Sequence, residues 1–236
     1  MAHHNALPTI SFCEDTLRLH KFPQHHVDKI MSAAAKAWSG WTTKEGLTNI
    51  RFGPGTPFSS PSGEVTVQAR LFMARLLKAL LREGYYLYTS SCVTAGDMDT
   101  MYFERRAPWT HPEVFAISVH EHDVLRVIGA PPNVVDRVTS CILHAYHHDN
   151  VHVSIYGSQN GGCTQFKLMG SPWSSNRSSR GHVLLSHVFG SLAAADWRIY
   201  ASIQLSHKST TKDTWFFCLE PLAELVQAMP ITEETS

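Results

Sequence analysis

Apolar positions along the chain follow two spacings, one typical of strands and one typical of helices. Apolar and polar residues alternate in Leu17-Arg18-Leu19, which predicts a strand with one buried face. Beyond Pro23 the apolar spacing lengthens to three and four residues, so one side of a helix becomes apolar. That stripe consists of Val27, Ile30, Met31, Ala34 and Trp38. The pattern therefore predicts a strand followed by an amphipathic helix.

The same pattern occurs a second time. Leu17 to Trp38 aligns without a gap with Leu125 to Tyr146, and seven of the 22 positions are identical, where chance gives roughly one or two. Three further blocks match in the same order: GTPFSS (55–60) with GSPWSS (170–175), GYYLYTS (84–90) with DWRIYAS (196–202), and DTMYF (99–103) with DTWFF (213–217). Four ordered matches indicate an internal duplication.

Each copy reads as a small α+β unit with the order β-β-α-β-α-β-β. After the first helix we expect a short strand at 49–52 or 165–168, a second helix at 64–82 or 180–195, and two closing strands. The fold class is therefore α+β, a tandem duplication whose copies pack with pseudo-twofold symmetry, as a homodimer would. The expected divisions are a first repeat at 10–106, a linker at 107–116, a second repeat at 117–220, and a helix-like segment and tail at 221–236.

Two finer expectations follow from the alignment. The second copy has seven more residues between its first helix and the GxPxSS turn, and we place them within His147 to Gly162. The aromatic and apolar residues of the matched blocks should form the core, and those expected to be buried are Trp38, Phe103, Tyr146, Trp197, Ile199 and Phe217.

Composition narrows the class of protein. The chain has 236 residues, 43% of them hydrophobic, which suffices for a packed core. Its 20 Lys+Arg balance 20 Asp+Glu, so no basic surface for nucleic acid is indicated. No stretch approaches the roughly 18 to 20 apolar residues that span a bilayer, and we expect no membrane association and a cytoplasmic protein. Five scattered cysteines without a CxxC pair indicate neither a disulfide framework nor a thiolate zinc site.

The GxPxSS turn before each second helix is one candidate binding site. Its backbone N–H groups and hydroxyls suit an anion, but the same residues suit a helix cap in which Phe58 or Trp173 packs inward. The candidate residues are Ser59, Ser60, Trp173, Ser174 and Ser175.

A polar strand face is a second candidate. Tyr88 with Ser90, and Tyr200 with Ser202, stand two residues apart and are expected to share a face, opposite the apolar face of Trp197, Ile199, Ala201 and Ile203. This Tyr/Ser face either binds a ligand or has a structural role only, as a side of the sheet that solvent or a helix covers. Asp99 and Asp213 lie near it as strand-end carboxylates or as Asp-Thr turns.

Arg18 lies between Leu17 and Leu19, and Arg126 lies between Leu125 and Val127, so both arginines should point away from the core that these apolar residues enter. Each arginine is expected to form an ion pair, either with a carboxylate of the same chain or with a bound anion.

Histidine is unusually frequent, with 15 residues. His144 and His148 stand four apart near a helix end, and His120 and His122 form an HxH on an expected strand, so both pairs have spacings that suit one zinc ion. However, His144 lies on the side of the helix away from Ile142, and Lys36 occupies its place in the first copy.

These observations favour a non-catalytic ligand-binding or protein-interaction module, a pseudo-dimer of two repeats that binds a protein or a small ligand without a cofactor. No GxSxG elbow or Cys/His signature marks catalytic residues. The alternative is a metal-dependent hydrolase or another enzyme that uses zinc and the His-rich second repeat.

Overall fold

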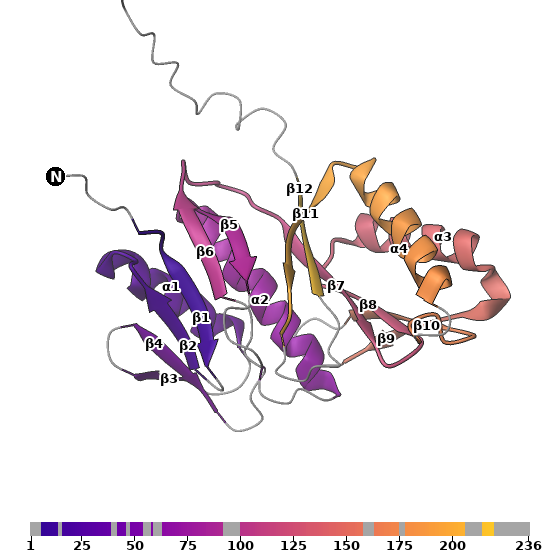
Figure 1. Ribbon diagram of the computed structural model, residues 1–236, viewed down its shortest axis with the longest axis horizontal. Coiled ribbons are helices and arrows are strands. Elements are labelled where there is room, and N and C mark those ends of the chain that lie inside the picture. Colours follow the sequence, from indigo (N-terminus) through magenta and orange to yellow (C-terminus); the bar gives the residue numbers. More distant parts are fainter. Residues whose placement is uncertain are drawn as a thin grey trace, which may run out of the picture.

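The structure is a computed structural model (Figure 1). It describes residues 6–13, 16–38, 42–45, 48–53, 58, 63–91, 100–157, 163–174, 178–205 and 214–219. The expected C-terminal segment at 221–236 lies outside these residues.

The first repeat is a six-stranded antiparallel sheet with two helices. Its elements are β1 (Thr9–Cys13), β2 (Thr16–His20), α1 (Gln24–Ala37), β3 (Thr42–Glu45), β4 (Asn49–Phe52), α2 (Glu64–Arg82), β5 (Tyr85–Ser91) and β6 (Thr100–Arg105). The strand order across the sheet is β3-β4-β2-β1-β6-β5.

The second repeat has the same plan. Its elements are β7 (Val114–His120), β8 (Val124–Ile128), α3 (Pro132–Tyr146), a 3-10 helix η1 (His148–Asn150), β9 (Val151–Tyr156), β10 (Cys163–Leu168), α4 (Ser178–Ala193), β11 (Trp197–Ile203) and β12 (Thr214–Leu219). Read from the β9 edge, the order β9-β10-β8-β7-β12-β11 matches the first sheet strand for strand. The predicted α+β tandem duplication is confirmed.

Three details differ from the sequence-based expectation. Each repeat has six strands rather than five, because β3 and β9 precede the strand that was expected after the first helix. The second repeat begins with β7 at Val114, within the segment expected to be a linker. The second hairpin has six-residue strands where the first has four, and its first strand, β9, lies with η1 in the region from His147 to Gly162 where extra residues were expected.

The helices form where their stripes predict. Pro132 occupies the first turn of α3, where its missing N–H leaves no hydrogen bond unmade. Val134, Val138, Ile142 and Tyr146 then recur at helical spacing and are all buried. This stripe packs with Leu184, Val188 and Leu192 of α4 over one face of the second sheet.

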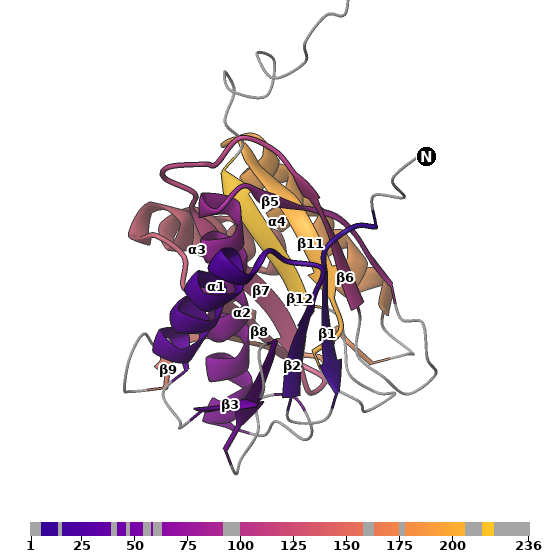
Figure 2. The same cartoon turned by 90° about the vertical axis from the view of Figure 1, so that its left-hand side faces the viewer.

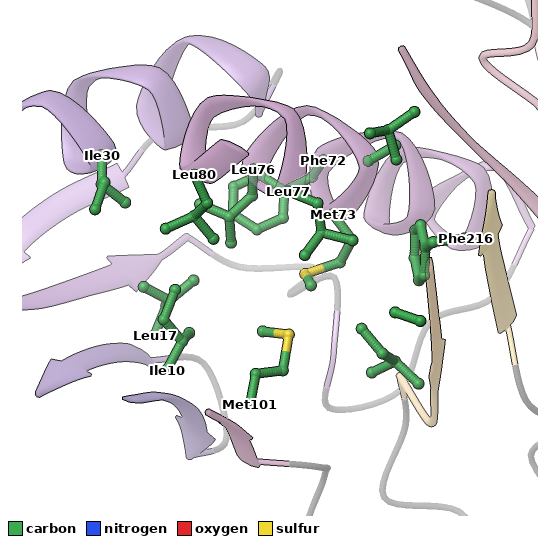
Figure 3. Close-up of a cluster of buried hydrophobic side chains, with 14 of the residues drawn as sticks. Ile10, Leu17, Ile30, Phe72, Met73, Leu76, Leu77, Leu80, Met101 and Phe216 are labelled. Carbon is green, nitrogen blue, oxygen red and sulfur yellow. The ribbon is translucent and has the colours of Figure 1, made fainter. Parts of the chain in front are cut away.

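The second sheet is buried on both faces. Phe115, Leu125 and Phe217 face α3 and α4, whereas Ala116, Ile128 and Phe216 belong to the core that contains α2. Figure 2 shows α2 in front of β7 and β8, and Figure 3 shows α2 between the first sheet and Phe216 of β12. Helix α2 therefore packs on the sheets of both repeats.

The contacts between the repeats are only partly symmetric. Equivalent strands β5 and β11 lie against each other, as a pseudo-twofold relation requires. In contrast, α2 covers the outer face of the second sheet, while Arg18 and His20 on the corresponding face of β2 are exposed. The two equivalent sheet faces thus have different environments.

Five of the six residues expected in the core are buried or half-buried, but Ile199 is 46% exposed. The strand pairing of β11 with β12 shifts between Ile199 and Ala201, which is a β-bulge. The extra residue reverses the alternation, so Trp197 faces α3 and α4 while Ala201 and Ile203 face the core around α2. The expectation that these four residues share one apolar face is wrong.

Candidate functional site

A pocket of about 560 Å³ opens between the end of α3 and the first turns of α4. Its apolar lining comes from Ala145, Tyr146, Met169, Val183 and Leu184, and its polar lining from His147, Asn150, Ser179 and Arg180. This volume falls in the range of small-molecule sites.

Hydrogen bonds fix the wall formed by α3. The Tyr146 hydroxyl donates to the Met169 carbonyl oxygen at 2.6 Å, which ties the end of α3 to the end of β10. The Met169 N–H donates to the Asn150 carbonyl oxygen at 2.9 Å. Because backbone atoms make most of these contacts, this wall is set by the fold rather than by flexible side chains.

The opposite wall depends on close packing of Trp173 against α4. A Cβ at Gly181 would lie 2.6 Å from the Trp173 ring and 2.7 Å from the Pro172 carbonyl oxygen, so only glycine fits there. The backbone N–H of Trp173 donates to the His122 carbonyl oxygen at 3.1 Å. Trp173 thus fixes the first turns of α4, which carry Ser179 and Arg180.

Backbone conformations uncommon for non-glycine residues occur beside the pocket. His147 has φ of 63° and Ser171 has φ of 51°, next to Gly170 at 86°. Left-handed conformations of this kind carry strain and are enriched at functional sites.

The pocket combines an exposed apolar surface with one positive charge. Met169 is 64% exposed and Val183 58%, although both are large apolar side chains. Arg180 stands in the first turn of α4, where the helix dipole disfavours a cation. An anionic group bound beside Arg180 would offset this unfavourable placement.

The candidate turn residues lie beside the pocket as far as the structure describes them. The Ser174 hydroxyl donates to the Ser171 carbonyl oxygen at 2.9 Å, so it closes the turn. Trp173 and Phe58 pack inward. Ser59, Ser60 and Ser175 lie outside the described residues.

The Tyr/Ser residues meet at the junction of the repeats. The Leu87 N–H donates to the Tyr200 hydroxyl at 2.7 Å, and the Ser90 hydroxyl donates to the Ser202 carbonyl oxygen at 3.3 Å. Tyr88 is 66% exposed. Both strands bulge at their tyrosine, so Tyr88 and Ser90, or Tyr200 and Ser202, do not follow simple alternation. Asp99 and Asp213 lie outside the described residues.

The two candidate arginines occupy different environments. Arg18 is exposed on β2. Arg126 is 6% exposed and donates through Nε to the Gln165 Oε1 and through Nη1 to the Thr66 Oγ1, both at 2.9 Å. It points away from the face covered by α3 and α4, as expected, yet it is buried beneath α2.

The candidate zinc ligands do not converge. The His120 Nε2 lies 2.8 Å from the Ser118 hydroxyl, and His122 lies in the turn after β7 rather than on the strand. His144 and His148 are exposed. Within the described ranges, no group of three or more His, Cys, Asp or Glu residues is placed to hold a metal ion.

Sequence reasoning missed most of the pocket, including Met169, Arg180 and Val183. One signal was present for Arg180, since a cation in the first turn of a helix opposes the dipole. The apolar residues carry no comparable signal, because their exposure depends on the packing of α3 against α4.

Two tandem copies of a ββαββαββ unit define a duplicated α+β domain protein. One domain-family model matches the chain twice, over residues 9–104 and 113–218, and the chain belongs to this family, whose function is not established. No curated protein and no solved structure matches the chain. In the described parts of the chain, no helix is long and apolar enough to cross a membrane.

Proposed function

We propose that this protein is a non-catalytic binding module whose ligand is a small molecule with an apolar body and an anionic group. The observation that carries the proposal is the pocket between α3 and α4, where exposed apolar side chains stand beside Arg180. We also propose that the protein is cytoplasmic. The proposal favours a small ligand over a nucleic acid because the formal net charge of the chain is zero.

The two kinds of lining residue have separate roles in this proposal. Met169 and Val183 cover the apolar body, and burial of apolar surface contributes roughly 25 cal/mol per Å². Arg180 pairs with the anionic group, a charge-assisted contact typically stronger than a neutral hydrogen bond. Asn150 and Ser179, which also line the pocket, supply further polar contacts.

The alternative, a metal-dependent hydrolase, has less support from the positions of the histidines. A catalytic zinc site commonly uses three protein ligands and one open position. His120 is hydrogen-bonded to Ser118, and His144 and His148 are exposed. These positions favour binding over metal-assisted hydrolysis.

The test uses two matched fluorescent probes, 8-anilino-1-naphthalenesulfonate and the uncharged N-phenyl-1-naphthylamine. We expect Arg180→Gln to weaken sulfonate binding about 10-fold and to leave the uncharged probe unaffected, because one charge-assisted contact is worth about 1.5–3 kcal/mol. Val183→Asp should weaken both probes.

Arg137→Gln is the matched control, because Arg137 lies on α3 with its Nη1 3.5 Å from the Ser191 carbonyl oxygen and does not line the pocket. It should bind both probes as the wild type does. The proposal is wrong if the wild type binds neither probe, or if Arg180→Gln and Val183→Asp bind both as tightly as the control.

A further inference from the structure

Two arginines are buried together where α2 covers the second sheet. Arg70 of α2 is 3% exposed and Arg126 of β8 is 6% exposed. Both contact the same residue: Arg70 Nη1 donates to the Thr66 carbonyl oxygen at 2.8 Å, and Arg126 Nη1 donates to the Thr66 hydroxyl at 2.9 Å. Both guanidinium groups therefore bind the same residue, Thr66, in the first turn of α2.

The neighbours of this pair are electrically neutral. Arg126 also donates to the Gln165 side-chain oxygen at 2.9 Å and lies over the Tyr156 ring, 4.1 Å from its centroid. Arg70 Nε is buried and has no hydrogen-bond partner among the described residues. Neither arginine takes part in an ion pair formed by those residues.

Burial of two like charges without a counter-charge is costly. Burial, followed by the positive charge of Arg126, lowers the pKa of Arg70 from 12.5 to about 10. Arg70 nevertheless stays protonated at neutral pH, so the cost cannot be relieved by loss of a proton. A bound anion would relieve it and would also satisfy the unpartnered Nε.

The pair does not follow from the repeat fold itself. Arg18, the counterpart of Arg126, is exposed, and each pairs with a serine on the neighbouring strand. His182 stands as far before β11 as Arg70 does before β5, and it is exposed too. The buried pair exists only at the junction between α2 and the second sheet.

We propose that this junction binds a small oxyanion, a phosphate or a carboxylate group, between Arg70 and Arg126. Two guanidinium groups offer parallel N–H donors that match the oxygens of either group. The Thr66 hydroxyl already donates to the Gly63 carbonyl oxygen at 2.7 Å, so the anion takes its hydrogen bonds from the arginines. This site is separate from the pocket between α3 and α4 and does not depend on its proposed ligand.

The first experiment measures thermal unfolding of the full chain in sodium phosphate, sodium acetate and sodium chloride at equal pH and ionic strength. A ligand that binds only the folded state raises Tm, and we expect about 5 °C at 100-fold excess over its Kd. A shift with phosphate alone assigns a phosphate site, and an equal shift with acetate assigns a carboxylate site. Equal Tm values in all three salts overturn the proposal.

The second experiment locates the site. Arg126→Gln and Arg70→Gln should each abolish the anion-dependent shift, whereas Arg18→Gln, the matched exposed counterpart, should retain it. Arg180→Gln should also retain it, and its loss there would move the anion to the pocket and overturn the proposal. If both buried-arginine variants fail to fold, native mass spectrometry of the wild type replaces them. We expect one anion bound per chain in phosphate or acetate buffer, and a spectrum with no bound anion overturns the proposal.

Discussion

Tyr88 and Tyr200 occupy the same bulge position in β5 and β11, but among the described residues Tyr200 alone of the two accepts a hydrogen bond from the other repeat. Its hydroxyl lies 2.7 Å from the Leu87 nitrogen, whereas Tyr88 is 66% exposed. The duplication therefore supplies two equivalent tyrosines, of which one joins the repeats.

Tyr200→Phe should lower the free energy of unfolding by about 1–2 kcal/mol, because the Leu87 N–H loses its acceptor at the junction. Tyr88→Phe is the matched control and should change it by less than about 0.5 kcal/mol. Urea denaturation of both variants makes the comparison. Equal losses would mean that the junction bond contributes nothing to stability.

Gly181→Ala should destabilise the protein by about 1–3 kcal/mol, because its new methyl group overlaps the Trp173 ring and the Pro172 carbonyl. Gly190, on the same helix, has no atom within 4 Å of an added Cβ. Gly190→Ala should therefore stabilise by about 0.5–1 kcal/mol. Thermal unfolding distinguishes the two signs, and a neutral Gly181→Ala would show that α4 is free to shift away from Trp173.

Buried His26 makes stability depend on pH. Its Nδ1 lies 2.5 Å from the Tyr85 hydroxyl, and burial, with the positive charge of Arg105 second, lowers the pKa of His26 below 6.5. Protonation of His26 is thus disfavoured in the folded state. The stability that neutral His26 contributes is fully present above pH 6.5 and is lost as the pH falls below that value.

The matched variant combines His26→Val with Tyr85→Phe, which leaves no hydroxyl without a partner. Val134 and Trp197 fill the corresponding positions of the second repeat, so an apolar pair is compatible with the fold. Urea unfolding at pH 7.5 and 5.5 should show a smaller loss of stability for the variant than for the wild type. An equal loss would assign the acid sensitivity to other groups.

Phe217→Ala should cost about 3–5 kcal/mol, because this residue is 1% exposed and stacks on Phe115 with ring centroids 5.2 Å apart. Ile199→Ala on the paired strand should cost less than about 1 kcal/mol, since Ile199 is 46% exposed. Chemical denaturation of both variants tests the placement of the bulge, and similar costs would contradict it.

The duplication could be predicted because short local sequence patterns repeat in the same order. The stripe from Val27 to Trp38 and its copy in α3 depend only on helical spacing, and the matched turns and strands preserve their order. Strand β3, with the sequence Thr-Thr-Lys-Glu, has no apolar alternation to reveal it. The bulges at Tyr88 and Tyr200 move the side chains that follow them to the opposite face of the sheet, and simple alternation along the sequence does not predict this change.

The two candidate sites depend on contacts between distant segments. Thr66 and Arg126 are 60 residues apart in the chain, and the burial of Arg126 follows from the position of α2 on the second sheet. Only the direction of Arg126, away from the core that contains Leu125, was predictable, from its place between Leu125 and Val127. The pocket likewise requires the ends of α3 and α4 to meet, which no single segment specifies.

The position of α2 has a consequence for synthesis of the protein. Twelve of its nineteen residues are buried, and Leu71 lies beside the β8–α3 turn, where a Cβ added at Gly129 would be 3.1 Å from the Leu71 Cδ1. The ribosome releases α2 before any strand of the second sheet exists, so the side of α2 that carries Leu71 stays uncovered at least until β7 and β8 have been translated. The nascent first repeat therefore presents an apolar helix surface of the kind that chaperones bind, even though its own sheet is already complete.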